Sequence, residues 1–145
     1  MLKTLSVLGY LTMIAGLAGL MATKHLLFTS PVVIALQGMA LFLMIWARIT
    51  FGRRSFHFAA NPTEGGLVTD GPYRFIRHPI YAAVLIFCWA GFAAGSISWG
   101  AILCRALILA GCLMRIACEE KLVTARYPEY AAYAAKTWRV MPCVY

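Results

Sequence analysis

The sequence predicts an all-α integral membrane protein with about four transmembrane helices, two single spans and then a helical hairpin, and a cytoplasmic C-terminal helix at the membrane interface. The chain of 145 residues is 62% hydrophobic and only 12% charged, whereas a soluble domain is about one quarter charged. Long apolar runs alternate with polar segments that are too short to build a core of their own. This pattern predicts a single domain, residues 1–145.

The first two spans are predicted at residues 4–23 and 30–50. The first of these runs carries no charge and is too long for the apolar core of a signal peptide, so we interpret it as a retained span. The second begins around Pro31, which suits the first turn of a helix. It is closed by Arg53 and Arg54.

The third and fourth spans are predicted as a hairpin at residues 80–94 and 98–118. Between Pro79 and Met114 the only charged residue is Arg105. One helix over that stretch would be about 54 Å long, against a hydrocarbon core of about 30 Å. The chain must therefore fold back, and the break is expected at 90–100, where glycine and serine residues cluster.

The basic residues predict the orientation. Under this count all but one of the loop charges fall on the same side, with only Lys24 on the other. The residues on the first side are Lys3, Arg53, Arg54, Arg74, Arg77, Lys121, Arg126, Lys136 and Arg139. The positive-inside rule then places both termini, the loop 52–78 and the segment 119–145 in the cytoplasm. Topology and lipid headgroups also explain the net charge of +8 better than nucleic acid does.

The densest polar cluster, "GPYRFIRHPIY" at 71–81, stands directly before the third span. A charged stop at the bilayer surface is the simplest explanation for it. However, Pro79 restrains His78 towards an extended backbone, which would fix the direction of the imidazole at headgroup level. Tyr73 and Tyr81 flank that histidine, so the cluster is also a candidate site.

Two adjacent acids, Glu119 and Glu120, follow the fourth span, and Arg115 stands four residues before the first of them on the same helix face. Ordinary ion pairs at a helix end would explain this spacing. Positive residues are nevertheless favoured at a cytoplasmic helix end, by the helix dipole and by lipid charge. Arg105, deeper in the span, predicts either a buried partner or snorkelling to the surface.

Taken together, "GPYRFIRHPIY", the helical hairpin, "RIACEEKL" and a Tyr-x-x-Tyr segment resemble the isoprenylcysteine carboxyl methyltransferase family, whose relatives include the phospholipid N-methyltransferases. The resemblance covers about Gly65 to the C-terminus. It implies a pocket for S-adenosylmethionine that is open to the cytosol, a lipophilic methyl acceptor that enters from the bilayer, and a C-terminal segment that caps the cofactor. The implied cofactor contacts are Gly65, Gly66, Leu67, Val68, Tyr73, His78, Pro79, Ile80, Tyr81 and Glu119. Arg115 would address the acceptor or the reacting end, and Glu120 would be a contact or a brace there.

The chemistry of these residues is compatible with that pocket. Carboxylates accept hydrogen bonds from ammonium and hydroxyl groups, and arginine pairs with carboxylates. Methyl transfer gains much of its acceleration from alignment in a dry site. A carboxylate acceptor needs no general base, whereas an amine must lose a proton, for which Glu120 or His78 are candidates.

Two departures and two alternatives accompany the resemblance. "ARYPEY" stands where many relatives have a Phe-Gly pair. The chain is also shorter than the eukaryotic enzymes of the family, so the resemblance implies a compact prokaryotic relative in an inner membrane. Membrane sterol reductases share part of the signature and use NADPH, but they have more spans. A four-span transporter is the non-enzymatic alternative.

The five cysteines show no CxxC spacing, so we expect packing residues and no metal site.

Overall fold

The computed structural model describes residues 1–52 and 66–142, and every regular element in these ranges is helical. The long helices are α1 (Leu2–Ala22), α2 (Pro31–Phe51) and α4 (Trp99–Arg126), and the shorter ones are α3 (Pro79–Trp89) and α5 (Tyr130–Ala134). Two 3₁₀ helices, η2 (Gly71–Arg74) and η3 (Ala90–Ala94), flank α3. The all-α prediction is confirmed. Gly65 lies outside the described residues.

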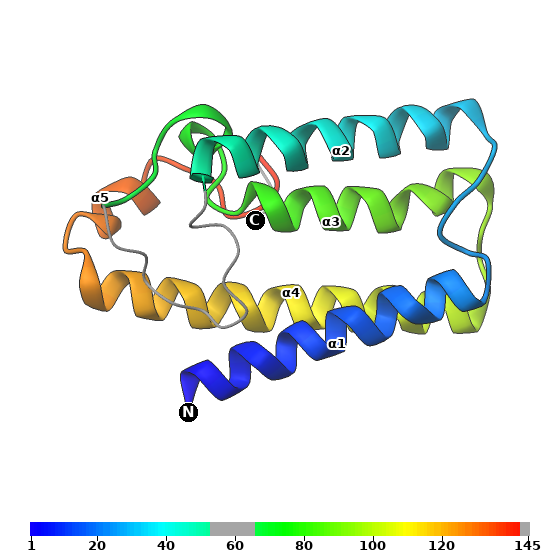
Figure 1. Cartoon of the computed structure of the whole chain (residues 1–145), viewed down its shortest axis with the longest axis horizontal. Helices are drawn as coiled ribbons and strands as arrows, with labels where there is room; N and C mark the ends of the chain where they lie inside the picture. The colour runs from blue at the N-terminus through cyan, green and yellow to red at the C-terminus, as the bar shows by residue number, and fades with distance from the viewer. Residues whose placement is uncertain (53–65, 143–145) are drawn as a thin grey trace.

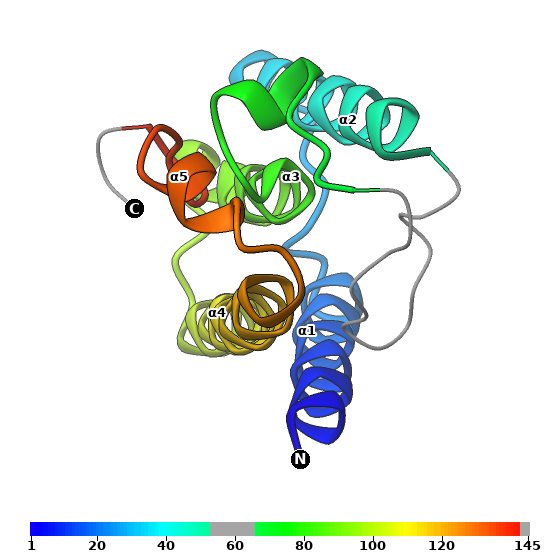
Figure 2. The same cartoon turned by 90° about the vertical axis from the view of Figure 1, so that its left-hand side faces the viewer.

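The helices are arranged as two pairs, α1 along α4 and α2 along α3, with fewer contacts between α3 and α4 (Figures 1 and 2). Glycines allow α1 and α4 to approach closely. A Cβ at Gly16 would lie 2.5 Å from the Cys104 carbonyl oxygen, and one at Gly111 would lie 2.5 Å from the Gly9 carbonyl oxygen. Small residues at such contacts are typical of helices that pack within a bilayer.

Three helices, α1, α2 and α4, are long and apolar enough to cross a membrane, and the segment Pro79–Ala94 is a shorter apolar helix. Large apolar side chains are exposed along the helices, among them Leu8, Leu11, Ile34, Phe42 and Ile49. Such extensive apolar exposure is accounted for by a surrounding hydrocarbon phase. The chain is an integral membrane protein, while its fourth crossing and its orientation stay predictions.

The C-terminal part differs from the interfacial helix that the sequence predicts to end near Arg139, with Pro128 as a candidate interruption. Helix α4 continues past the expected end of the span to Arg126. It stops there because Tyr127, which precedes Pro128, takes an extended backbone (φ −121°, ψ 100°). The short α5 comes next, and a non-helical segment succeeds it. We call residues 130–142 the C-terminal tail.

Arg105 is buried where α4 begins, at the end of the bundle that also holds the α1–α2 connection and η3. We call this the far end. The side chain is 1% exposed, so it does not snorkel. Its Nε donates to the Cys88 carbonyl at 3.0 Å, Nη1 to the Ser96 carbonyl at 3.0 Å and Nη2 to the His25 carbonyl at 3.3 Å. The guanidinium also lies 4.3 Å from the centroid of the Phe92 ring. One side chain thus joins α3, α4 and both connections.

His25 completes this far end. Its Nδ1 lies 2.7 Å from Ser96 Oγ, and its Nε2 lies 3.2 Å from Ser98 Oγ. Gly91 leaves the room that the guanidinium occupies, since a Cβ there would lie 2.5 Å from Arg105 Nη2. The far end is therefore a packed polar cluster that fixes the hairpin turn.

Candidate functional site

At the opposite end of the bundle, which we call the site end, His78 is held by its backbone. It precedes Pro79, the first residue of α3, with φ −124° and ψ 59°. Its N–H donates to the Arg139 carbonyl at 2.9 Å, and its carbonyl accepts from the Ala82 N–H at 3.0 Å. Both neighbouring peptides are fixed, so the imidazole projects from a defined position.

Glu119 is the point at which α3 and α4 meet in this site. Its Oε1 accepts a hydrogen bond from the Tyr81 hydroxyl and lies 3.3 Å from Arg115 Nη2. Its Oε2 lies 3.8 Å from His78 Nδ1. The carboxylate side chain is 25% exposed, so it is accessible while it is held by three neighbours.

Arg115 connects that carboxylate to α1. Its side chain is only 7% exposed. Nε donates to the Tyr81 hydroxyl at 2.7 Å, and Nη1 donates to the Ser6 carbonyl at 3.3 Å. The Tyr10 ring centroid lies 5.2 Å from the guanidinium carbon, within range of a cation–π interaction. The first helix therefore forms one wall around this arginine.

Glu120 has a different environment from Glu119. Its carboxylate lies 3.2 Å from Arg77 Nε, 3.4 Å from His78 Nε2 and 3.0 Å from Arg139 Nη2. Arg139 Nε adds a second contact at 3.1 Å. Three cationic or polar side chains thus converge on one acid, and charge-assisted contacts of this kind are the stronger class of hydrogen bond.

The C-terminal tail is fastened to the segment just before α3. Arg77 Nη1 donates to the Ala134 carbonyl at 2.8 Å and also to the Thr137 carbonyl. The Arg77 N–H donates to the Trp138 carbonyl at 2.7 Å, and the Trp138 N–H donates to the Phe75 carbonyl at 3.0 Å. These contacts form a short parallel pairing of backbone over the entrance of α3.

Two tail tyrosines face inward. The Tyr133 hydroxyl donates to the Tyr73 carbonyl at 2.7 Å, and the Tyr130 and Tyr133 rings meet edge to face at 5.9 Å. Burial raises the pKa of Tyr133 to about 12. The pKa of Tyr73 is also raised, by burial and then by Tyr133 and Glu119. These phenols stay protonated and can act as hydrogen-bond donors at neutral pH.

The other predicted cofactor residues lie around this cluster. Gly66, Leu67 and Val68 are half-buried, and Gly66 has a φ of +86°, a left-handed conformation that favours glycine. Ile80 is half-buried on α3, beside the buried Pro79. The role of these residues as cofactor contacts stays a prediction.

Among the residues that the structure describes, no group of three or more His, Cys, Asp and Glu side chains could hold a metal ion. The four cysteines in these ranges, Cys88, Cys104, Cys112 and Cys118, are free thiols.

Some residues of the site could not be identified from the sequence. The positive-inside rule alone accounts for Arg139, whereas Arg77 belongs to the polar cluster at 71–81 that the sequence already marks as a candidate site. Arg139 lies 19 positions from Glu120, and no local spacing predicts that pair. Ser6 and Tyr10 lie in a helix whose sequence shows no sign of contact with Arg115.

The sequence profile of the family described as phospholipid methyltransferase matches residues 26–130. This range spans most of the chain and includes His78, Tyr81, Arg115 and both acids. The chain belongs to the phospholipid methyltransferase family. That family contains isoprenylcysteine carboxyl methyltransferase-like proteins, so the resemblance drawn from the motifs is confirmed at the family level.

Family membership implies methyl transfer that depends on S-adenosylmethionine and acts on a lipid-related substrate. No curated protein and no solved structure matches the chain. Helix α1 lies outside the matched range, yet it contributes the Ser6 carbonyl and the Tyr10 ring to the surroundings of Arg115.

Proposed function

We propose that this protein transfers a methyl group from S-adenosylmethionine to a lipophilic acceptor, a carboxylate, amine or thiol, at the cytoplasmic membrane interface. The observation that carries the proposal is the convergence of His78 and Tyr81 with Arg115 and Glu119. Two motifs that are separated by the hairpin meet at one end of the bundle, within 2.7–3.8 Å.

The side chains at this point fit the cofactor. Glu119 offers acceptor oxygens for an ammonium or hydroxyl group. His78, Tyr73 and Tyr81 offer directed polar contacts, and the half-buried Leu67 and Val68 offer apolar surface. When bound, S-adenosylmethionine supplies a methyl group on a positively charged sulfur. The accessible Glu119 carboxylate, whose side chain is 25% exposed, suits that charge.

Arg115 is proposed to orient the acceptor or the reacting end of the site. Its guanidinium is already held by the Tyr81 hydroxyl, the Ser6 carbonyl and Glu119. A group held on several sides keeps its position when a substrate arrives, and alignment of this kind supplies much of the rate of a displacement reaction. An anionic acceptor would be addressed directly by its positive charge.

Glu120 is proposed to act as a brace in the reacting part of the site. Its carboxylate is the acceptor for Arg77, His78 and Arg139, which favours a holding role over that of a proton acceptor. Through Arg139 it keeps the C-terminal tail over the entrance of α3, where the tail would exclude water from the reaction.

The proposed setting is a prokaryotic inner membrane crossed four times, with both termini in the cytoplasm. The distribution of basic residues supports this orientation. Within the family we favour an enzyme of the isoprenylcysteine carboxyl methyltransferase-like type. Incubating a membrane extract with protein and isotopically labelled cofactor, followed by mass spectrometry of the lipids, would identify the acceptor.

The site is tested by calorimetric titration of S-adenosylmethionine into the protein in detergent. We expect Glu119→Ala and His78→Ala to abolish binding without changing the unfolding temperature. Glu129→Ala, which removes an exposed acid at the start of α5, is the matched control and should bind normally.

Unchanged affinity in both site variants would reject the assignment of the cofactor pocket. Binding of NADPH and not of S-adenosylmethionine by the unmodified protein would reject the proposed reaction in favour of a reductase.

A further inference from the structure

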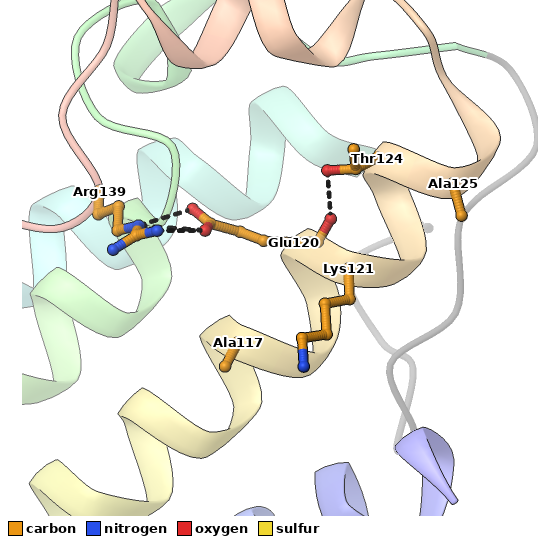
Figure 3. Close-up of a pocket in the computed structure, with 6 residues that line it drawn as sticks. All are labelled: Ala117, Glu120, Lys121, Thr124, Ala125 and Arg139. Atoms are coloured by element: carbon orange, nitrogen blue, oxygen red, sulfur yellow. Dashed lines mark hydrogen bonds and ion pairs between the residues drawn. The ribbon is translucent and has the colours of Figure 1, made fainter.

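A groove lies on α4 beside the C-terminal tail. It shares Glu120 with the proposed site but contains none of the proposed cofactor contacts. Its volume is about 510 Å³, and it is lined by Ala117, Glu120, Lys121, Thr124, Ala125 and Arg139. Figure 3 shows these residues on one side of α4, with Arg139 reaching across from the tail to Glu120. We call this space the α4 groove. Ligand pockets of small molecules occupy a similar range of volumes, about 300–1,000 Å³.

The charges of the α4 groove favour an anion. Lys121 is exposed, and the Arg139 side chain is 40% exposed even though it pairs with Glu120. The negative charge of Glu120 is also shared with Arg77 at 3.2 Å. Two cations at the rim therefore outweigh one acid that is already paired. The Thr124 hydroxyl already donates to the Glu120 carbonyl at 2.7 Å, so the cations alone favour the anion.

An apolar stripe leads into the groove along the surface of α4. Leu109, Leu113 and Ala117 are all exposed, and they follow one another at four-residue spacing. Residues at this spacing are neighbours on the helix surface, and each step turns about 40° further around the axis. The next two positions in the same series are Lys121 and Ala125. The apolar residues on this membrane-spanning helix are therefore followed by a cation. A phospholipid has the matching order, with its acyl chains followed by a negatively charged phosphate.

We propose that the α4 groove binds the phosphate headgroup of an anionic phospholipid, with an acyl chain lying along Leu109, Leu113 and Ala117. Lys121 and Arg139 contact the phosphate, and the small side chain of Ala117 leaves space for the glycerol. The apolar stripe favours a lipid over free phosphate, because a soluble anion gains nothing from it. In this proposal the lipid is a structural ligand and not the methyl acceptor, so its binding does not depend on methyl transfer.

The test measures lipid retention by native mass spectrometry of the protein in detergent, with phosphatidylglycerol, phosphatidylcholine or inorganic phosphate as the probe. We expect phosphatidylglycerol to be retained in preference to phosphatidylcholine. Lys121→Gln should weaken that retention about fivefold, the size expected for one lysine near an anionic surface. Lys136→Gln removes the same charge from an exposed position outside the groove and should retain the lipid as the unmodified protein does.

A second pair of variants tests the shape of the groove. Ala117→Trp fills the groove without changing the charge and should also lose phosphatidylglycerol. Ala131→Trp, at an exposed position on α5, should not. Unfolding temperatures that match the unmodified protein would show that each variant is folded.

Three results would overturn the proposal. Equal losses in Lys121→Gln and Lys136→Gln would mean a diffuse effect of charge. Full retention in both Lys121→Gln and Ala117→Trp would mean that the lipid binds elsewhere. Displacement of the lipid by excess inorganic phosphate would mean that the groove is a site for a soluble anion.

Discussion

The two ends of the bundle hold their arginines in opposite ways. At the far end the donors of Arg105 go to the carbonyls of His25, Cys88 and Ser96 and to one serine hydroxyl. At the site end, Arg77, Arg115 and Arg139 each contact a glutamate, as well as carbonyl oxygens of the chain in the first two cases.

The different partners of the arginines indicate a structural role for the far end and a ligand-binding role for the site end. Backbone carbonyls cannot leave Arg105 without breaking the turns that present them, so the far end is fixed. Carboxylates on flexible side chains can exchange one partner for another, and they can accept a cationic or hydroxylated ligand. We therefore expect substitutions at the far end to change folding and substitutions at the site end to change binding.

The largest effect is expected from Arg105→Met. The buried carbonyls of Cys88 and Ser96 and the partly buried carbonyl of His25 would lose this donor. Each buried acceptor left unsatisfied costs about 1–3 kcal/mol. We predict a loss of more than about 3 kcal/mol in the free energy of unfolding, measured by denaturant titration in mixed micelles. Arg105→Lys keeps the positive charge but loses the several donors of the guanidinium. Its free energy of unfolding should lie between those of Arg105→Met and the unmodified protein. A variant as stable as the unmodified protein would remove the contrast between the ends.

Glu120→Gln should have the next largest effect, and it should be local. A hydrogen bond to a charged group contributes about 1.5–3 kcal/mol, so the C-terminal tail should detach at least about tenfold more often. The rate of tryptic cleavage after Lys136 and Arg139 measures this, with Glu129→Gln as the control. Cleavage at the rate of the unmodified protein would show that the tail is held by Arg77 and the backbone pairing alone.

Tyr10→Leu tests whether α1 takes part in the site end. The loss of a ring beside Arg115 removes a cation–π contact of about 0.5–2 kcal/mol. We expect methyl incorporation into a membrane extract to fall by about twofold to thirtyfold, with the affinity for the cofactor unchanged. Tyr10→Phe keeps the ring and should restore the activity. Equal losses in both variants would assign the role to the hydroxyl.

The smallest effect is expected in the alkaline pH range in which the C-terminal tail is released from the bundle. The pKa of Tyr133 is raised from 10.0 to about 12 by burial, so the folded state keeps the phenolic proton longer than the unfolded state. The resulting stabilisation is complete below about pH 10 and is lost as the pH rises towards about 12. Trp138 fluorescence should follow release of the tail in this range. Tyr133→Phe should flatten that dependence, and an unchanged profile would place the titration elsewhere.

Much of the site could be predicted because its motifs are local. His78-Pro79 fixes a backbone through the sterics of one proline, and Arg115 and Glu119 share a helix face through their four-residue spacing. The roles of the two acids could not be predicted. Only the tail brings Arg139 to Glu120, and only α3 brings Tyr81 to Glu119.

The tail itself shows where local reasoning stops. Pro128 is a sequence signal for an interruption after the fourth span, and α4 does end just before it. The alanine and tyrosine content of the segment beyond predicts a helix, but most of that segment is non-helical, and part of it pairs with the backbone of residues 75–78 instead. A short peptide gains little from forming an isolated helix, so the available tertiary partner decides its conformation.

By itself, the sequence determined the helical membrane class, the position of the hairpin turn within a glycine- and serine-rich stretch, and the chemistry carried by the two motifs. These depend on hydrophobicity, chain length and contacts within a few residues. The tertiary structure alone decided that α1 packs on α4, that Arg105 fixes the far end, and that Glu119 and Glu120 have different partners. Those outcomes depend on which surfaces meet, and no spacing along the chain encodes them.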